Sequence, residues 1–111
     1  MKNKDTLIIL LITFVLALSC LPLFKNIHHI NVNWDWLQEL AFARVSRQAI
    51  LEYGQFPLRT PYFNGGYSLI GHPLENSLNP FFLPILIFGE NLGLKINIFL
   101  FHLLGAFGMY Y

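Results

Sequence analysis

The sequence predicts an all-α membrane protein in which two transmembrane helices are joined by an extracytoplasmic loop that carries an amphipathic surface helix. Three observations predict this class. Residues 6–24 contain no charged side chain, 55% of the 111 residues are hydrophobic, and only 12% are charged, against ~25% in soluble domains. The net charge of +1 provides no basic field for nucleic acid. The single cysteine, Cys20, excludes an internal disulfide framework and a cysteine-rich zinc site.

The first transmembrane helix is predicted over residues 6–24, which read TLIILLITFVLALSCLPLF. At ~1.5 Å per residue, this run is long enough to cross a hydrocarbon core of ~30 Å. A cleaved signal peptide and a lipoprotein signal ending at Ser19-Cys20 remain as alternatives. The run is longer than the ~7–15 residues of a signal core, and Leu18 stands where a lipoprotein signal has a smaller residue. An uncleaved membrane helix is therefore the favoured interpretation.

The flanking charges predict the orientation of this helix. Lys2, Lys4 and the amino terminus precede it and are partly offset by Asp5, whereas only Lys25 closely follows it. Since positive charge favours the cytoplasmic side, residues 1–5 are expected in the cytoplasm and the loop over residues 25–79 outside it. The chain is thus predicted to be a multi-pass protein of the cell membrane, in contact with membrane lipid.

Within the loop, a surface helix is predicted over residues 34–53, which contain neither Gly nor Pro. Asn33 is the expected N-cap, and Gly54 is the expected stop. One side of this helix carries apolar residues, and another side carries polar ones. The apolar set is Leu37, Leu40, Ala41 and Leu51, and the polar set is Asp35, Glu39 and Ser46. Trp34 and Trp36 suit the level of the lipid headgroups, so we expect the helix to lie on the outer membrane surface.

The remaining elements are predicted from the helix-breaking residues Pro and Gly and from the lengths of the apolar runs. Residues 54–79 are rich in Pro and Gly and are predicted to be an ordered, turning loop rather than a helix or a regular sheet. Residues 80–91 are predicted to form a short interfacial helix and a turn, and residues 92–111 a second transmembrane helix from which Lys95 reaches outward. Because the sequence stops within this apolar run, we expect it to be the beginning of a longer protein.

Two carboxylates are the first candidates for chemistry. Asp35 follows the first membrane helix and stands between two tryptophans, where a carboxylate can act as a general base or a metal ligand. The alternative is a helix-start acid that interacts with the helix dipole. Glu39 lies four residues on and shares a helix face with Asp35, so the pair could hold a divalent cation. The alternative is an ion pair between Glu39 and a nearby arginine.

The other candidates are cations and a glycine turn. Arg44, Arg47 and Arg59 match the geometry of phosphate oxygens, or they pair with Glu39, Glu52 or lipid headgroups. Asn64-Gly65-Gly66 permits close approach of a ligand, or it forms a plain turn. The four histidines lack the spacing of a zinc site, so no metal site is predicted on them.

An ordered set of short motifs follows Asp35. Residues 53–62 read YGQFPLRTPY and residues 63–66 read FNGG, and after them come His72-Pro73, Asn79-Pro80 and Phe88-Gly89. In this order, residues 33–111 resemble the amino-terminal part of multi-spanning membrane glycosyltransferases of the GT-C superfamily, especially the YfhO-like branch. Two positions depart from the family pattern: Arg59-Thr60 stands where Trp-Asn is frequent, and Tyr67-Ser68 stands where a Pro is usual.

The resemblance implies transfer of a sugar from a polyprenyl-phosphate donor to an acceptor outside the cytoplasm. It implies that Asp35 is catalytic and acts near the acceptor, as a base or as the partner of a divalent cation in the full-length enzyme. Arginines of the same loop would neutralise the departing phosphate. The predicted substrate-binding residues of the loop are Glu39, Arg44, Arg47, Arg59, Asn64, Gly65 and Gly66. Since such enzymes have many membrane helices, this chain alone is expected to be inactive. The alternative is a small non-enzymatic membrane protein that packs on a larger membrane partner.

Overall fold

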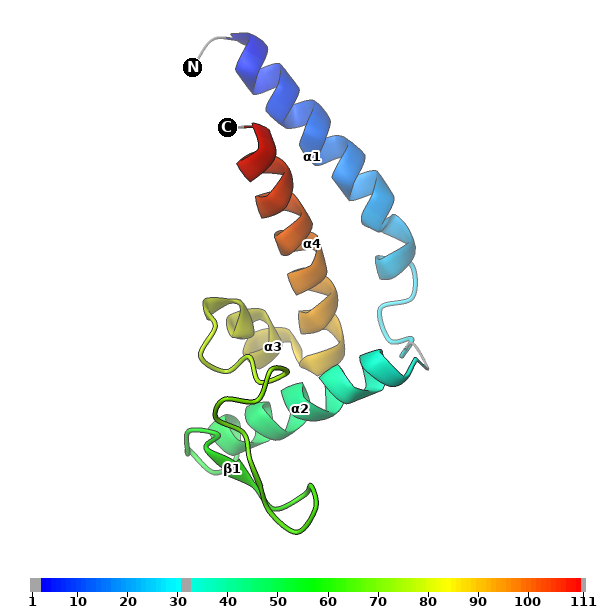
Figure 1. Cartoon of the computed structure of the whole chain (residues 1–111). Helices are drawn as coiled ribbons and strands as arrows, with labels where there is room; N and C mark the ends of the chain where they lie inside the picture. Colours follow the sequence, from blue (N-terminus) through cyan, green and yellow to red (C-terminus); the bar gives the residue numbers. More distant parts are fainter. Residues whose placement is uncertain (1–2, 31–32, 111) are drawn as a thin grey trace. The chain divides into compact units, whose positions relative to one another are not determined.

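The computed structural model describes residues 3–30 and 33–110 of the chain (Figure 1). Residues 1–2 of the predicted cytoplasmic segment and residue 111 of the predicted second transmembrane helix lie outside the described residues. Within them, the chain is mostly helical, with four α-helices, one 3-10 turn and a two-residue β ladder. The residues divide into two compact units. The first combines the segment up to Ile27 with the segment from Lys95 onward, and the second is His28–Leu94.

The first unit contains two helices that are long and apolar enough to cross a membrane. These are α1 (Asn3–Phe24) and most of α4 (Glu90–Tyr110). α1 begins three residues before the predicted span and ends where predicted. α1 buries little of its surface, and Leu7, Leu10 and Phe14 are exposed. Because exposing such side chains to water is unfavourable, the composition of α1 suits lipid better than water.

Side chains connect α1 and α4 near both ends. The Tyr110 hydroxyl donates to Asp5 Oδ1 at 3.3 Å, and Lys95 Nζ donates to the carbonyls of Asn26 and Ile27 at 2.9 and 3.1 Å. The two helices are therefore antiparallel. We expected Lys95 to reach outward to the membrane surface, but it is only 2% exposed. Its ammonium group instead binds carbonyls of the segment that follows α1, which connects this segment to α4.

The second unit begins with α2 (Trp34–Leu51), which is drawn in cyan to green in Figure 1. The helix starts after Asn33, whose backbone is extended, but the Asn33 side chain makes no capping hydrogen bond. It ends at Leu51, and a turn through Glu52 and Tyr53 leads to Gly54 at φ +59°. The predicted helix over residues 34–53 thus corresponds to α2 plus this turn.

The segment after α2 contains a small antiparallel ladder that the sequence did not predict. β1 (Arg59–Thr60) pairs with β2 (Tyr67–Ser68), with Arg59 opposite Ser68 and Thr60 opposite Tyr67. The turn between the strands is possible because Asn64, Gly65 and Gly66 all have positive φ. The ladder has only two residues per strand, so the predicted turning loop contains a short hairpin rather than a regular sheet.

Two short helical segments precede α4. η1 (Pro80–Phe82) begins at Asn79, whose Oδ1 accepts the Phe81 amide at 3.0 Å, and α3 (Leu83–Phe88) follows directly. Gly89 at φ +87° separates α3 from α4. We expected Glu90 and Asn91 to form the turn, but they lie in the first turn of α4, where the Glu90 carboxylate suits the helix dipole.

The core of the second unit is a small apolar cluster. Its buried members are Leu40, Ala43, Phe82, Ile85 and Leu94, with Trp36, Ile50 and Leu86 packed against it. The face of α2 toward this core differs from the predicted apolar side, because Leu37 and Leu51 are 41% and 55% exposed while Ser46 is fully buried. Ser46 is buried because its hydroxyl donates to Glu75 Oε2 at 2.6 Å.

Candidate functional site

Asp35 is the second residue of α2 and is exposed. Within residues 3–30 and 33–110, its carboxylate makes no hydrogen bond and no ion pair. Its position in the first turn places the negative charge at the positive end of the helix dipole. The carboxylate is thus fixed on a rigid element and free to accept a proton or a hydrogen bond.

A hollow of about 250 Å³ lies one helical turn from Asp35. We call it the aromatic hollow, and it is lined by Gln38, Ala41, Phe42, Phe63, Asn64, Tyr67 and His72. Gln38 is three residues after Asp35, so their side chains are neighbours on the helix surface. The hollow is smaller than the ~300–1,000 Å³ of drug-sized sites, which suits a group about as large as one sugar ring.

The aromatic rings of this hollow hold one another in place. The Phe42 ring stacks on His72 at 4.4 Å and on Phe63 at 5.0 Å between centroids, and Tyr67 meets His72 edge-on at 5.4 Å. His72 Nδ1 also accepts the Leu74 amide at 3.2 Å, which fixes the orientation of the imidazole. Ring surfaces together with two side-chain amides provide both the apolar contact and the donors and acceptors that a polyhydroxyl ligand requires.

The glycine turn has a structural role at this hollow. The Gly66 amide donates to the Phe63 carbonyl at 2.9 Å, and this bond closes the turn that carries Asn64 to the wall of the hollow. Asn64-Gly65-Gly66 is therefore a turn, as one interpretation of the sequence has it. The same turn also places the Asn64 amide at a candidate ligand site.

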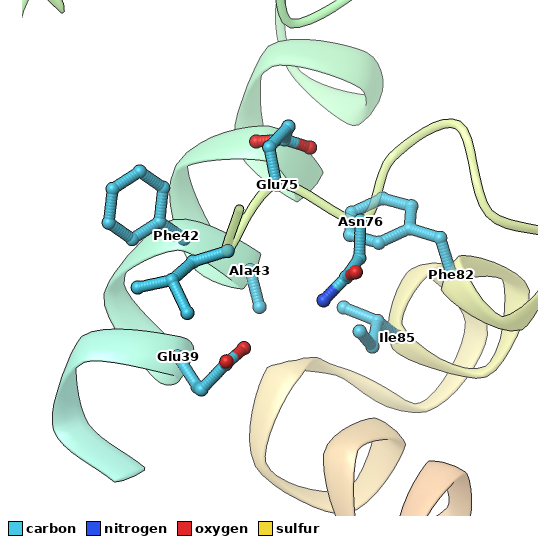
Figure 2. Close-up of a pocket in the computed structure, with 8 residues that line it drawn as sticks. Glu39, Phe42, Ala43, Glu75, Asn76, Phe82 and Ile85 are labelled. Atoms are coloured by element: carbon cyan, nitrogen blue, oxygen red, sulfur yellow. The ribbon is translucent and has the colours of Figure 1, made fainter. Parts of the chain in front are cut away.

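Glu39 lies in a different surrounding, shown in Figure 2. Its carboxylate points toward the Asn76 amide, in a hollow that Glu75, Phe82 and Ile85 also line. This hollow has no room for a water-sized sphere. Asp35 does not line this hollow, so the structure gives the two carboxylates different surroundings.

The two carboxylates of Figure 2 differ in their hydrogen bonds. Glu75 accepts the Ser46 hydroxyl at 2.6 Å and the Ser77 amide at 2.8 Å, whereas Glu39 has no hydrogen-bond partner in the described part of the chain. Burial without such a partner disfavours the charged form and raises the pKa of Glu39. Glu39 is thus a half-buried carboxylate beside the core, and its role in substrate binding stays a prediction.

Arg44 and Arg47 both face Glu90. Arg44 Nε lies 4.0 Å from Glu90 Oε1, and Arg47 Nη1 lies 3.9 Å from Glu90 Oε2. Arg47 Nε also donates to the Leu86 carbonyl at 3.4 Å, so Arg47 connects α2 to the end of α3. The partner of these arginines is therefore Glu90 rather than Glu39 or Glu52. Arg44 keeps 76% of its side chain exposed and remains accessible to a ligand.

Arg59 lies on β1, and its guanidinium rests against Gly66, another of the predicted residues. With 18 residues, α2 is ~27 Å long, and Asp35 lies in its first turn. The structure places Gln38 and Asn64 in the lining of the aromatic hollow, with Asp35 one helical turn from it, whereas Arg59 does not line this hollow. Gln38, His72 and Glu75 were not among the predicted residues. Gln38 belongs to α2 itself, and nothing in the spacing of the sequence indicates that His72 and Glu75 lie beside this helix.

No group of three or more His, Cys, Asp or Glu side chains able to hold a metal ion occurs among residues 3–30 and 33–110. The arrangement around Asp35 is therefore that of an accessible carboxylate beside an aromatic and amide-lined hollow. Comparison of the chain with protein-family models, with curated proteins and with solved structures finds no match.

Proposed function

We propose that this chain is the amino-terminal part of an integral membrane glycosyltransferase, which transfers a sugar from a polyprenyl-phosphate donor to an extracytoplasmic acceptor. The observation that carries the proposal is the unpaired, exposed carboxylate of Asp35, one helical turn from the aromatic hollow. Two helices able to cross a membrane and the motif order from Asp35 to Gly89 support it.

In the proposed reaction, Asp35 is the general base. Its carboxylate accepts the proton of an acceptor hydroxyl while that oxygen attacks the anomeric carbon of the donor sugar. The bond between the anomeric carbon and the phosphate oxygen breaks, and polyprenyl phosphate leaves with the bonding electrons. Two membrane helices are too few to enclose donor and acceptor, so the activity belongs to a larger membrane assembly of which this chain forms part.

The test is a transfer assay in membranes that hold the chain with its natural surroundings. Vesicles of known sidedness receive a radiolabelled polyprenyl-phosphate sugar, and label in the acceptor fraction is counted. Asp35→Asn should lower transfer by ~10²-fold or more, as expected for loss of a general base, with unchanged amounts of the chain in the membrane. Glu52→Gln is the matched control, because Glu52 is an exposed carboxylate at the other end of α2.

Two outcomes contradict the proposal. Transfer by Asp35→Asn at the rate of the unaltered chain would remove Asp35 from the reaction. Labelling of Asp35→Cys by a membrane-impermeant maleimide only from the cytoplasmic side, in a Cys20→Ser background, would place the carboxylate on the wrong face. Absence of transfer in membranes with the unaltered chain would favour the non-enzymatic alternative.

A further inference from the structure

A second hollow, of about 230 Å³, lies at the carboxyl end of α2. We call it the Arg59 hollow. Val45 and Ala49 of α2 line part of it, and its polar groups and rings come from Tyr53, Gln55, Phe56, Arg59, Thr60 and Tyr62. It is distinct from the aromatic hollow, because the two share no lining residue: Phe42 of α2 lines the aromatic hollow, whereas Val45 and Ala49 of α2 line this one.

The guanidinium of Arg59 lacks an acidic partner. Among residues 3–30 and 33–110, no carboxylate lies within 4.0 Å of it and no hydrogen bond uses it. Of the described residues that line the hollow, Arg59 alone is charged. The nearby Glu52 carboxylate accepts the Gln48 side-chain amide at 2.8 Å and does not line the hollow. The hollow therefore presents an uncompensated positive charge with planar, forked donors.

The position of the guanidinium depends on the hairpin. A Cβ atom at Gly66 would lie 2.9 Å from Arg59 Nη2 and 3.4 Å from Arg59 Nε, so the guanidinium rests against the backbone of this glycine. The ladder between β1 and β2 holds the Arg59 backbone opposite Ser68. This arrangement limits the rotamers of a long side chain, which lowers the entropy lost when the guanidinium binds an anion.

The remaining lining provides neutral donors and apolar surface. The Tyr53 and Tyr62 hydroxyls lie 3.4 Å apart at the hollow, and the Tyr62 amide donates to Thr60 Oγ1 at 3.2 Å. Gln55 adds a side-chain amide and Phe56 an exposed ring. A phosphate needs the guanidinium and hydroxyl donors, and a sugar-sized body attached to it can pack on the rings.

We propose that the Arg59 hollow binds a phosphate ester carried on a group of about the size of one monosaccharide. The site goes beyond the proposed proton transfer, because neither Asp35 nor any residue that lines the aromatic hollow lines it. The ester comes either from a water-soluble sugar phosphate or from the headgroup of an anionic lipid, and both present the same charge to Arg59.

The experiment uses the full chain in nanodiscs of phosphatidylcholine. Glucose 1-phosphate is titrated and binding is followed by ³¹P NMR line broadening. Arg59→Gln should weaken binding about tenfold, which is the loss expected when a charge-assisted pair is removed. The affinity of Arg59→Lys should lie between those of Arg59→Gln and the unaltered chain, because lysine keeps the positive charge but lacks the forked donors of the guanidinium. Tyr62→Phe tests the neutral donors without changing the charge and should weaken binding about threefold.

Lys25→Gln is the matched control, since it removes one positive charge from an exposed position in the first unit. It should bind glucose 1-phosphate as the unaltered chain does. Equal affinity of Arg59→Gln and the unaltered chain would overturn the proposal, as would an equal loss in Lys25→Gln, which would indicate unspecific attraction. Binding of neutral methyl glucoside with the same affinity would overturn it too.

A competition experiment distinguishes the two sources of the ester, a soluble sugar phosphate and an anionic lipid headgroup. Nanodiscs that contain phosphatidylglycerol should compete with glucose 1-phosphate if a lipid headgroup occupies the hollow, and should leave its affinity unchanged if the ligand is soluble. Because this readout is binding and the Asp35 readout is transfer, either proposal can fail while the other stands.

Discussion

Gly93→Ala is the substitution that tests the packing of the second unit most directly. Gly93 lies in the first turns of α4, where the helix meets α3. A Cβ atom at this position would lie 2.4 Å from the Cα and 2.7 Å from the backbone nitrogen of Ile85, and 2.9 Å from its Cγ1. Two of these three atoms belong to the backbone of a buried residue, so no side-chain rotation can relieve the overlap.

The expected magnitude combines two opposing effects. Overpacking of a well-packed site destabilises by ~1–3 kcal/mol, while alanine stabilises a helix interior by ~0.5–1 kcal/mol relative to glycine. Because the overlap is with backbone atoms, we expect the strain to exceed the gain and the net loss to be ~1–2 kcal/mol. For a domain of this size, such a loss of stability lowers the midpoint temperature of unfolding by roughly 5–10 °C.

The assay is thermal unfolding in detergent micelles, followed by the fluorescence of Trp36, which packs against the core cluster. Trp34 is replaced by Phe in every variant, because this exposed tryptophan would add an uninformative signal. Gly105→Ala is the matched control, since it lies in the same helix with nothing within 4 Å of its Cβ position. A Gly93→Ala protein as stable as the Gly105→Ala protein would refute the close crossing of α3 and α4.

Two further predictions concern the groups around Glu75. Ser46→Ala should destabilise the fold by ~1.5–3 kcal/mol, because a hydrogen bond to a charged group is lost at a fully buried position. Ser68→Ala is the control and should have little effect, because Ser68 is exposed. Equal unfolding midpoints for the two variants would contradict the prediction. Burial raises the pKa of Glu39 above 4.5, so the folded state holds the proton more tightly and its stability falls as the pH rises through this raised value. Glu39→Gln should therefore raise the unfolding midpoint at pH 7.5 but not at pH 4, and a gain that is equal at both values would show that titration is not its cause.

The features that the sequence predicted are those that depend on local properties. The length of the apolar run over residues 6–24 and the absence of Gly and Pro from residues 34–51 suffice to indicate α1 and α2. The two membrane-spanning candidates and the mostly helical fold were confirmed. The sidedness of the chain and the transfer reaction stay predictions.

The features that the sequence did not predict depend on contacts between distant residues. Ser46 bonds to Glu75 across 29 residues, and Arg47 bonds to the Leu86 carbonyl across 39. Such pairs change which face of α2 is buried, so a polar serine lies inside while Leu37 and Leu51 remain outside. Hydrophobic periodicity alone cannot anticipate this, because it assigns faces from residue type and not from the partners that a buried hydroxyl can find.

The hairpin over residues 59–68 gives the two hollows a common wall, and this decides how their tests can be interpreted. Asn64 lines the aromatic hollow, and Arg59 lines the other and rests against Gly66. Any change that opens the ladder would disturb both hollows, so loss of sugar-phosphate binding together with loss of transfer would indicate damage to the hairpin. Single side-chain changes at Asp35 and Arg59 leave the ladder hydrogen bonds intact, since both act beyond the backbone. Only the separate loss of one readout, with the other retained, assigns a function to one hollow.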